Sequence, residues 1–344
     1  IEALKQLSDG NFLTVKNLYQ IIHCKELLIA EYGVTKYKVG NMTEGTDGKT
    51  YDGMSHKIMD QIIAELKSET YKPAPTRRIN IPKSGGKTRP LGIPSINDKL
   101  VQGVVSKVLV AIYEQTFSKY SHGFRPNRGV HTAMRNIQSW YGVTWVIEGD
   151  IKGYFDNISH SVLIEILSRK IKDQRFIDLI WKFLRAGVKI NGKYEKTTLG
   201  TPQGAIISPI LSNIYLNEFD NYITEVKANK DTEETSIPNS EYVKAKSLLR
   251  CIKGKDRKNG YKELRKLHST KRVGFKLYYS RYADDWVIGI WGTRKEALEV
   301  KESVRIFLKD KLKLELSEEK TKVTHISKDK AYYLGFNFWS PKPK

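Results

Sequence analysis

Two groups of aspartates have the residue type and the surroundings that metal-assisted phosphoryl transfer requires. Asp150 follows the mostly apolar segment Trp145–Gly149, and Asp284 and Asp285 lie between two apolar segments later in the chain. Carboxylates gathered at strand ends repel one another unless cations neutralise them, and Mg²⁺ prefers such oxygen ligands. A pair of Mg²⁺ ions can activate an attacking hydroxyl and stabilise the leaving oxygen of an in-line transfer. The aspartates therefore predict a site for two Mg²⁺ ions.

The aspartate pair lies in the turn of a predicted hairpin. Residues 277–282 and 286–291 are mostly apolar or aromatic, as expected of two strands. The pattern alone leaves a plainer interpretation open, in which Asp150 caps a turn and Asp284 and Asp285 are ordinary turn residues.

Helices and strands alternate irregularly along the chain. Residues 78–93 predict two strands around a Gly-Gly turn, and residues 332–339 predict an aromatic hairpin. Asn97 is the expected N-cap of the first apolar helix. Apolar residues at helical spacing predict helices around residues 100–112, 162–167, 210–215 and 297–308. This uneven alternation favours an α+β fold over a doubly wound sheet.

The charge of the chain indicates a polyanionic partner. Lys and Arg number 59 against 38 Asp and Glu, a net charge of +21 over 344 residues. Nucleic acid is the commonest partner of so basic a chain. No apolar run is long enough for a transmembrane helix, and no secretory signal is visible. Cys24 and Cys251 are too few for a disulfide scaffold, so we expect a reducing compartment. The sequence shows no amphipathic basic helix or lipidation motif, so we expect no membrane partner.

Five sequence blocks in one order resemble the motifs of reverse transcriptases. Glu148–Ile158 is similar to motif A, and Leu199–Pro209 is similar to motif B. The sequence Tyr-Ala-Asp-Asp at 282–285 is similar to the YADD of motif C. Lys320 and the sequence Leu-Gly-Phe at 334–336 follow at the places of motifs D and E. Any one block is a weak signal, whereas five in this order are a strong one.

Two further blocks narrow the resemblance to the reverse transcriptases of group II introns, also called maturases. These blocks are Ser121–Arg128 and the sequence Gly-Thr-Asp-Gly at 45–48. The resemblance implies a right-hand polymerase with fingers and a palm, the palm being an antiparallel sheet packed with helices. Because the chain ends at Lys344, soon after motif E, we expect the helical thumb to be absent.

The resemblance also implies a division of the chain into four parts. Residues 1–115 would form an N-terminal extension and the fingers, and residues 116–157 the palm with motif A. Residues 158–203 would form the second part of the fingers. Residues 204–344 would complete the palm, with a basic insertion at about 225–276.

The resemblance assigns catalytic roles to matching positions. Asp150, Asp284 and Asp285 would hold the two Mg²⁺ ions, with the backbone carbonyl of Ile151 near a metal. Lys320 would protonate the pyrophosphate leaving group, although a solvated surface lysine is the plainer interpretation.

Five further positions match residues that bind the incoming dNTP. Lys83 and Arg89 would clamp its triphosphate, a task that suits an ammonium and a forked guanidinium. Phe155 would exclude a ribose 2′-hydroxyl, although a core aromatic is the plainer interpretation. Gln203 would contact the nucleotide near its sugar, and Gly204 would let the backbone approach the base pair.

A basic stretch outside these motifs predicts contacts with RNA phosphates. Lys244–Lys276 holds thirteen Lys and Arg against two acidic residues, a net charge of +11. Interleaved apolar residues favour a helical insertion, and a disordered charged loop is the alternative. The predicted RNA-binding residues, which include two on the basic strand region, are Arg77, Arg78, Lys253, Lys255, Arg257 and Lys258.

The predicted function is RNA-directed DNA synthesis by a group II intron maturase. Its partners would be the intron RNA, whose splicing it would aid, an RNA template with a DNA primer, and dNTPs. One alternative is an RNA-binding splicing cofactor for which catalysis is dispensable. Another is a different bacterial reverse transcriptase, such as a retron or diversity-generating type. The sequence leaves homodimerisation open and fits a bacterial cytoplasm, a mitochondrion or a plastid rather than secretion.

Overall fold

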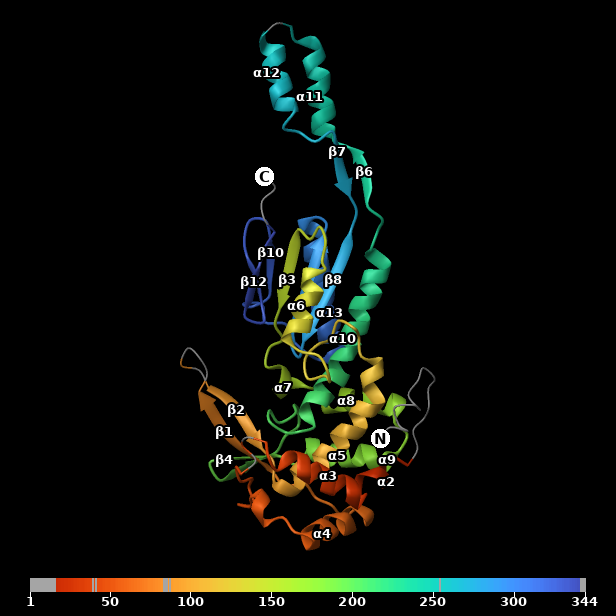
Figure 1. The fold of residues 1–344 in the computed structure, drawn as a ribbon, viewed down its shortest axis with the longest axis vertical. Helices are drawn as coiled ribbons and strands as arrows, with labels where there is room; N and C mark the ends of the chain where they lie inside the picture. The colour runs from red at the N-terminus through yellow and green to blue at the C-terminus, as the bar shows by residue number, and fades with distance from the viewer. Residues whose placement is uncertain are drawn as a thin grey trace.

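The computed structural model describes residues 17–340 except 39, 41, 83–85, 87 and 254. It has mixed helices and sheets, as the sequence predicts. Figure 1 shows three regions along the long axis: a helical region that holds the N-terminal part, a central sheet, and a helical arm. None of the described helices is both long and apolar enough to cross a membrane.

The helical region is built around one buried helix, α5 (Ile96–Tyr113). Four valines of α5 at 101, 104, 105 and 108 are fully buried, which explains its apolar sequence on nearly every side. Its N-cap is Ser95, whose hydroxyl accepts a hydrogen bond from the Asp98 N–H, so the predicted cap Asn97 is wrong. The helices around it are α2 (Tyr19–Ile22), α3 (Lys25–Thr35), α4 (His56–Lys67), α8 (His160–Lys170) and α9 (Gln174–Leu184).

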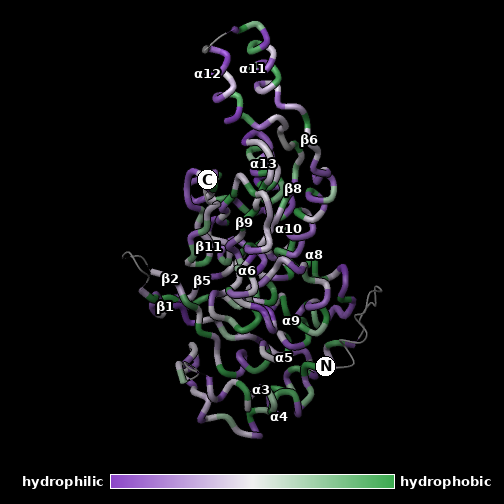
Figure 2. The backbone as a smooth tube through the Cα atoms, turned by 45° about the horizontal axis from the view of Figure 1, so that its top comes forward, coloured by the Kyte–Doolittle hydropathy of each residue, from purple (hydrophilic) through white to green (hydrophobic). Residues whose placement is uncertain are grey.

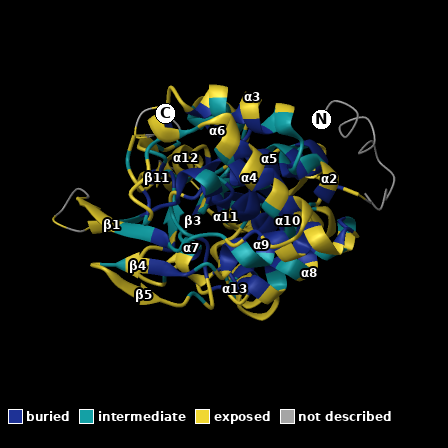
Figure 3. Cartoon of the chain, turned by 90° about the horizontal axis from the view of Figure 1, so that it is seen from below, coloured by how far each residue is buried: buried dark blue, intermediate teal, exposed yellow. Residues whose placement is uncertain are grey.

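A peripheral sheet extends sideways from this region. The predicted strand pair is present as β1 (Thr76–Pro82) and β2 (Thr88–Ile93), joined antiparallel. β4 (Val188–Ile190) pairs with β1 in parallel, and β5 (Lys193–Glu195) completes the order β2-β1-β4-β5. Figure 3 shows that the outer ends of β1 and β5 are exposed, so this sheet overhangs the body of the molecule.

The central sheet is antiparallel, with the order β10-β3-β9-β8. Its strands alternate between two buried faces. Ile147 and Ile288 point into the larger core with α10 and α13, while Val146 and Val287 point into a smaller core with α6. The elements are β3 (Trp145–Gly149), β8 (Lys276–Tyr282), β9 (Asp285–Trp291), β10 (Lys322–His325), α6 (Val130–Gln138), α10 (Ser208–Lys230) and α13 (Arg294–Leu312).

Short elements complete the described fold. The helix α7 (Tyr154–Asn157) follows β3 after a short turn. The predicted aromatic hairpin is present as β11 (Ala331–Tyr333) and β12 (Phe336–Phe338). Two 3₁₀ turns, η1 (Tyr51–Gly53) and η2 (Glu114–Thr116), lie in the helical region.

The arm is a helical hairpin carried by a two-stranded ribbon, and it extends away from the rest of the molecule (Figure 1). The ribbon is β6 (Thr235–Pro238) paired antiparallel with β7 (Thr270–Val273), and the helices are α11 (Ser240–Cys251) and α12 (Lys255–Leu264). A Cβ at Gly260 would lie 2.0 Å from Leu249 Cδ2, so the glycine lets the two helices pack closely. The predicted helical insertion is therefore confirmed, and its ribbon is an addition to the prediction.

Candidate active site

The tight turn between β8 and β9 presents the aspartate pair. Tyr282 pairs with Asp285, so Ala283 and Asp284 form a two-residue turn. Ala283 has φ +55°, a left-handed conformation that costs a residue with a Cβ roughly 1–2 kcal/mol. Glycine is the usual residue in such a position, so the surrounding contacts must hold the alanine there.

Asp150 lies beside this turn because of the strand register. Gly149, the last residue of β3, pairs with Trp286, the second residue of β9, so Asp150 follows next to the start of β9. A Cβ at Gly149 would lie 2.0 Å from the Trp286 ring, so only glycine lets that ring pack there. The sequence prediction that one strand end meets the hairpin turn is confirmed in this respect.

The charges of the site show that two of the aspartates share it. Burial raises the pKa of Asp284, and the nearby carboxylate of Asp150 raises it further. The positive charges of Arg89 and Arg281 oppose both effects. Asp285 is exposed at the first position of β9. Within the described part of the chain, no three carboxylate, histidine or cysteine side chains converge closely enough to form a metal-binding cluster.

Lys320 supplies a positive charge to this site. Its ammonium donates a hydrogen bond to the Asp150 carboxylate at 3.0 Å. The loop that carries it is tied to motif A, because the Ser317 N–H donates to the Asp150 carbonyl and the Lys152 N–H to the Glu315 carbonyl. Neither of these two bonds uses the Ile151 carbonyl. The structure thus brings Lys320 to the side chain of Asp150 from 170 residues away.

The donor set fits a divalent cation. Asp150 and Asp284 are close enough for one carboxylate to raise the pKa of the other, which is the situation a bound cation relieves. A cationic ammonium already contacts Asp150, which shows that the site favours positive charge. The residues that would hold Mg²⁺ are Asp150, Asp284 and Asp285 with the Ile151 carbonyl, although the third aspartate is not gathered with the other two here.

Motif B packs directly under the strand β2. The Gly92 N–H donates to the Gln203 carbonyl at 2.5 Å. Gly204 has φ +107°, and a Cβ there would lie 2.4 Å from the Gly92 carbonyl oxygen and 2.8 Å from Leu91 Cδ1. Gly204 therefore allows a close approach within the chain itself, in addition to the predicted approach to a base pair. Arg89 lies on the same strand and affects the pKa of Asp284, whereas Lys83 lies outside the described residues.

Phe155 is half-buried on α7, within motif A. Its ring meets the Tyr154 ring edge-on at 5.2 Å, and its carbonyl accepts a hydrogen bond from the Thr201 N–H at 2.7 Å. A Cβ at Gly200 would lie 2.8 Å from that carbonyl oxygen. The backbone of the predicted sugar-selecting residue is thus fixed by motif B.

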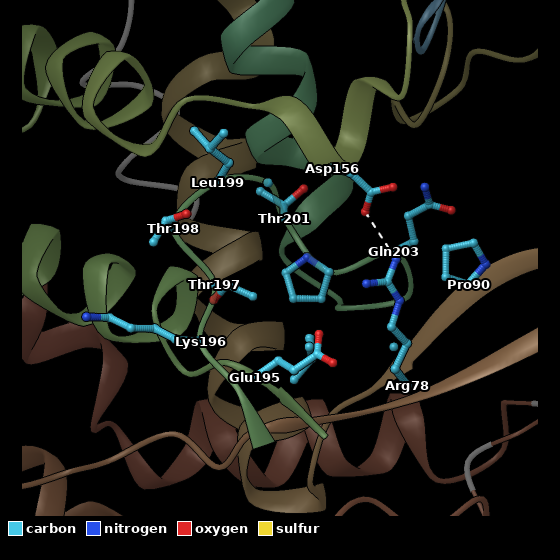
Figure 4. Close-up of a pocket in the computed structure, with 14 residues that line it drawn as sticks. Arg78, Pro90, Asp156, Glu195, Lys196, Thr197, Thr198, Leu199, Thr201 and Gln203 are labelled. Atoms are coloured by element: carbon cyan, nitrogen blue, oxygen red, sulfur yellow. Dashed lines mark ion pairs between the residues drawn. The ribbon is translucent and has the colours of Figure 1, made fainter. Parts of the chain in front are cut away.

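A cleft of about 450 Å³ opens between β1, β2 and the segment that leads into motif B (Figure 4). Arg78 reaches across it to Asp156, 3.6 Å away. Gln203 also lines the cleft, with three threonines at 197, 198 and 201. The second predicted RNA-binding arginine, Arg77, donates to the Glu44 carbonyl.

Sequence reasoning missed a buried polar network behind the turn. Arg281 and Asp220 form an ion pair at 2.6 Å with both side chains fully buried. Arg281 also donates to the carbonyl of Ala283 in the turn. The available signal was Arg281 itself, a charged residue within a segment, 277–282, that is mostly apolar or aromatic. A charge in such a segment must find a partner.

The block at 121–128 serves this network. The Arg125 guanidinium donates to the carbonyls of Ser118 and Ser121 and to the Glu114 carboxylate. It thereby fixes the loop that continues the sheet beside β8, where the His122 N–H donates to the Arg281 carbonyl. This arginine, which sequence reasoning used only as part of a motif, is structural.

Comparison with known proteins identifies the family. A family model described as reverse transcriptase (RNA-dependent DNA polymerase) matches residues 81–338. The chain belongs to the reverse transcriptase family. The chain is 40% identical to the group II intron-encoded protein LtrA of Lactococcus lactis, over 98% of this chain and 59% of LtrA. The predicted resemblance to group II intron maturases is thereby confirmed.

Two other relatives show how the match is distributed. An uncharacterized 91 kDa protein in the cob intron of Schizosaccharomyces pombe is 41% identical over 95% of this chain and 42% of that protein. Protein YkfC of Escherichia coli is 36% identical over 94% of this chain and 83% of YkfC. The chain thus spans about half the length of LtrA and the cob intron protein and most of YkfC.

Proposed function

We propose that this protein is the RNA-directed DNA polymerase of a group II intron maturase, which also binds its intron RNA to aid splicing. The observation that carries the proposal is the shared site of Asp150 and Asp284, with Lys320 in contact with Asp150. Perturbed pKa values of paired carboxylates are typical of functional sites. A scaffold that only binds RNA has no need of this pairing.

The residues of the site would divide the reaction among them. Asp150, Asp284 and Asp285 would hold two Mg²⁺ ions, which when bound activate the primer 3′-hydroxyl and neutralise charge on the leaving pyrophosphate. Lys320 would be the proton donor to the pyrophosphate, because its flexible stem places an ammonium 3.0 Å from Asp150. Arg89 would hold the triphosphate, as its charge already acts on this site.

The nucleotide would be selected by residues on the motif B side. Phe155 would lie under the sugar and exclude a 2′-hydroxyl, which its fixed backbone favours. Gln203 would contact the sugar region of the nucleotide from the edge of the cleft. Arg78 in the cleft would offer its guanidinium to the phosphates of a template strand.

The right-hand polymerase architecture remains part of the proposal. The central antiparallel sheet with α10 and α13 would be the palm, and the helical region with β1 and β2 the fingers. The arm would present Lys253, Arg257 and Lys258 to intron RNA. Lys255 would act with them, although its side chain lies outside the described residues.

Primer extension separates the polymerase from a splicing cofactor with dispensable catalysis. Asp150→Asn and Asp284→Asn keep side-chain size but remove the charge that binds Mg²⁺. Both should abolish DNA synthesis by the full-length protein and leave intron RNA binding nearly unchanged. Asp310→Asn, at an exposed position on α13, is the matched control and should extend the primer normally. Wild-type synthesis by either aspartate variant would rule out the assignment.

A further inference from the structure

The guanidinium of Arg281 is bonded through all three of its nitrogen atoms. Nε and Nη2 donate to the two carboxylate oxygens of Asp220 at 2.7 and 2.6 Å. Nη2 also donates to the Ser121 hydroxyl at 2.8 Å, and Nη1 to the Asn213 side-chain oxygen at 3.2 Å. The remaining bond, from Nη1, ends on the Ala283 carbonyl at 2.8 Å. One side chain thus joins α10, the loop at 118–123 and the aspartate turn.

The turn needs such support because of its own backbone. Ala283 has a left-handed φ, and its carbonyl leads directly into Asp284. The loop at 118–123 packs closely against the turn, because a Cβ at Gly123 would lie 2.4 Å from the Ala283 nitrogen. The Asn213 amide donates to the Gly123 carbonyl, so the same network holds the turn from the back.

The far end of the network is anchored as firmly. Asp220 is fully buried on α10, and it accepts a further hydrogen bond from the Tyr279 hydroxyl at 2.8 Å. Tyr279 is also buried and lies on β8, two residues before Arg281. Two residues of the strand that ends in the turn, Tyr279 and Arg281, therefore hold the Asp220 carboxylate. Because Asp220 belongs to α10, this helix sets the orientation of the Arg281 guanidinium.

We propose that Arg281, oriented by Asp220, is a positioning residue that sets the backbone of the turn and so the carboxylates of Asp284 and Asp285. This inference rests on the proposed polymerase function. The hydrogen bond from Arg281 to the Ala283 carbonyl fixes the peptide that leads into Asp284, and the bonds of Arg281 to Asp220 tie that peptide to α10. A fixed turn favours a correctly placed carboxylate for metal binding.

If the Arg281–Asp220 pair only stabilised the fold, a different result would be expected. Buried ion pairs are often replaceable by apolar residues of similar volume without loss of stability, because removing both charges also removes their desolvation. Such a replacement would preserve the fold but would leave the Ala283 carbonyl without its donor. Activity and metal binding, compared with stability, therefore distinguish positioning from packing.

The test uses two variants and one matched control in the full-length protein. Arg281→Lys keeps the charge and loses the fork, and the double variant Arg281→Met with Asp220→Leu removes both charges. The control removes the Glu31–Lys107 pair, whose carboxylate is similarly buried but lies on α3 in the helical region, by Glu31→Gln with Lys107→Met. Thermal melts, single-turnover primer extension and Mn²⁺ binding by electron paramagnetic resonance are measured on each.

Both Arg281 variants should fold, extend a primer roughly tenfold to hundredfold more slowly, and bind Mn²⁺ several-fold more weakly, because small misplacements carry such costs. The KM for dNTP should change little, and the control should match wild type. A folded variant with wild-type rate and Mn²⁺ affinity would overturn the inference. If the double variant does not fold, Arg281→Lys decides in the same way. An inactive wild type would refute the proposed polymerase, while weaker Mn²⁺ binding by Arg281→Lys would still support positioning.

Discussion

The arm offers the prediction whose magnitude can be worked out most directly. Lys253, Arg257 and Lys258 are exposed near its tip, and Lys255 begins α12. Figure 2 shows hydrophilic and hydrophobic stretches side by side on its two helices. If these cations contact RNA phosphates, replacing all four by glutamine should weaken binding of the intron RNA. Each of the four replacements keeps a long polar side chain and removes one positive charge.

The expected size follows from counterion release. Each phosphate contact contributes roughly 0.7–0.9 to the slope of log K against log[salt], so losing four should flatten the slope by about three units. The stability of the protein should change by less than about 0.5 kcal/mol, because Lys253, Arg257 and Lys258 are exposed. DNA synthesis on a short generic primer–template should survive, since the arm extends away from the aspartate turn (Figure 1).

The assay is fluorescence anisotropy with the intron RNA and with an unrelated RNA duplex, at several KCl concentrations. The matched control removes four exposed lysines from the body of the protein, at positions 295, 309, 311 and 328. A second control replaces residues 239–269 by an Asn-Gly turn, because Pro238 already pairs with Thr270 across the ribbon. An unchanged slope in the arm variant would mean that these charges are merely solvated. Equal losses on both RNAs would mean general affinity without recognition of the intron.

Two further predictions concern the sugar and the pH. Phe155→Ala should admit ribonucleotides in single-turnover competition with dNTPs, and unchanged discrimination would make Phe155 a core residue only. Burial raises the pKa of Asp98 to about 6. The folded state therefore binds a proton that the unfolded state releases, and the free energy of unfolding should fall by about 2 kcal/mol from this group as the pH rises from 4 to 7. Asp98→Asn should remove this dependence in denaturant titrations, and an identical pH profile in both proteins would contradict it.

The parts of the fold that the sequence predicted depend on local patterns. The β8–β9 hairpin follows from two apolar segments around a four-residue motif, and α13 from apolar residues at helical spacing. The proximity of Asp150 to the turn was predicted because the order of the sequence blocks resembles that of the reverse transcriptase motifs. Local hydrophobic periodicity specifies elements well, and a known motif order supplies the long-range contact that periodicity lacks.

The parts that the sequence did not predict depend on contacts between distant residues. β10 pairs with β3 although the other two strands of the sheet, β8 and β9, lie between them in the sequence. The helix cap is an instructive local failure: Ser95 and Asn97 are both good N-cap residues, and the path of the chain after β2 selects the serine. The ribbon β6–β7 is exposed on all four residues of β6, so it has no alternating apolar pattern to reveal it.

The aspartate turn combines features that stability alone would not favour. Ala283 is held in a left-handed conformation, Asp284 is a half-buried carboxyl whose pKa a second carboxylate raises, and Arg281 is a fully buried cation. Each of these is costly, and together they are the kind of strain and perturbed ionisation that cluster at functional sites. An RNA-binding scaffold would fold as well with an apolar pair behind a glycine turn. These unfavourable features are explained if the carboxylates must remain ionised and fixed in place for chemistry.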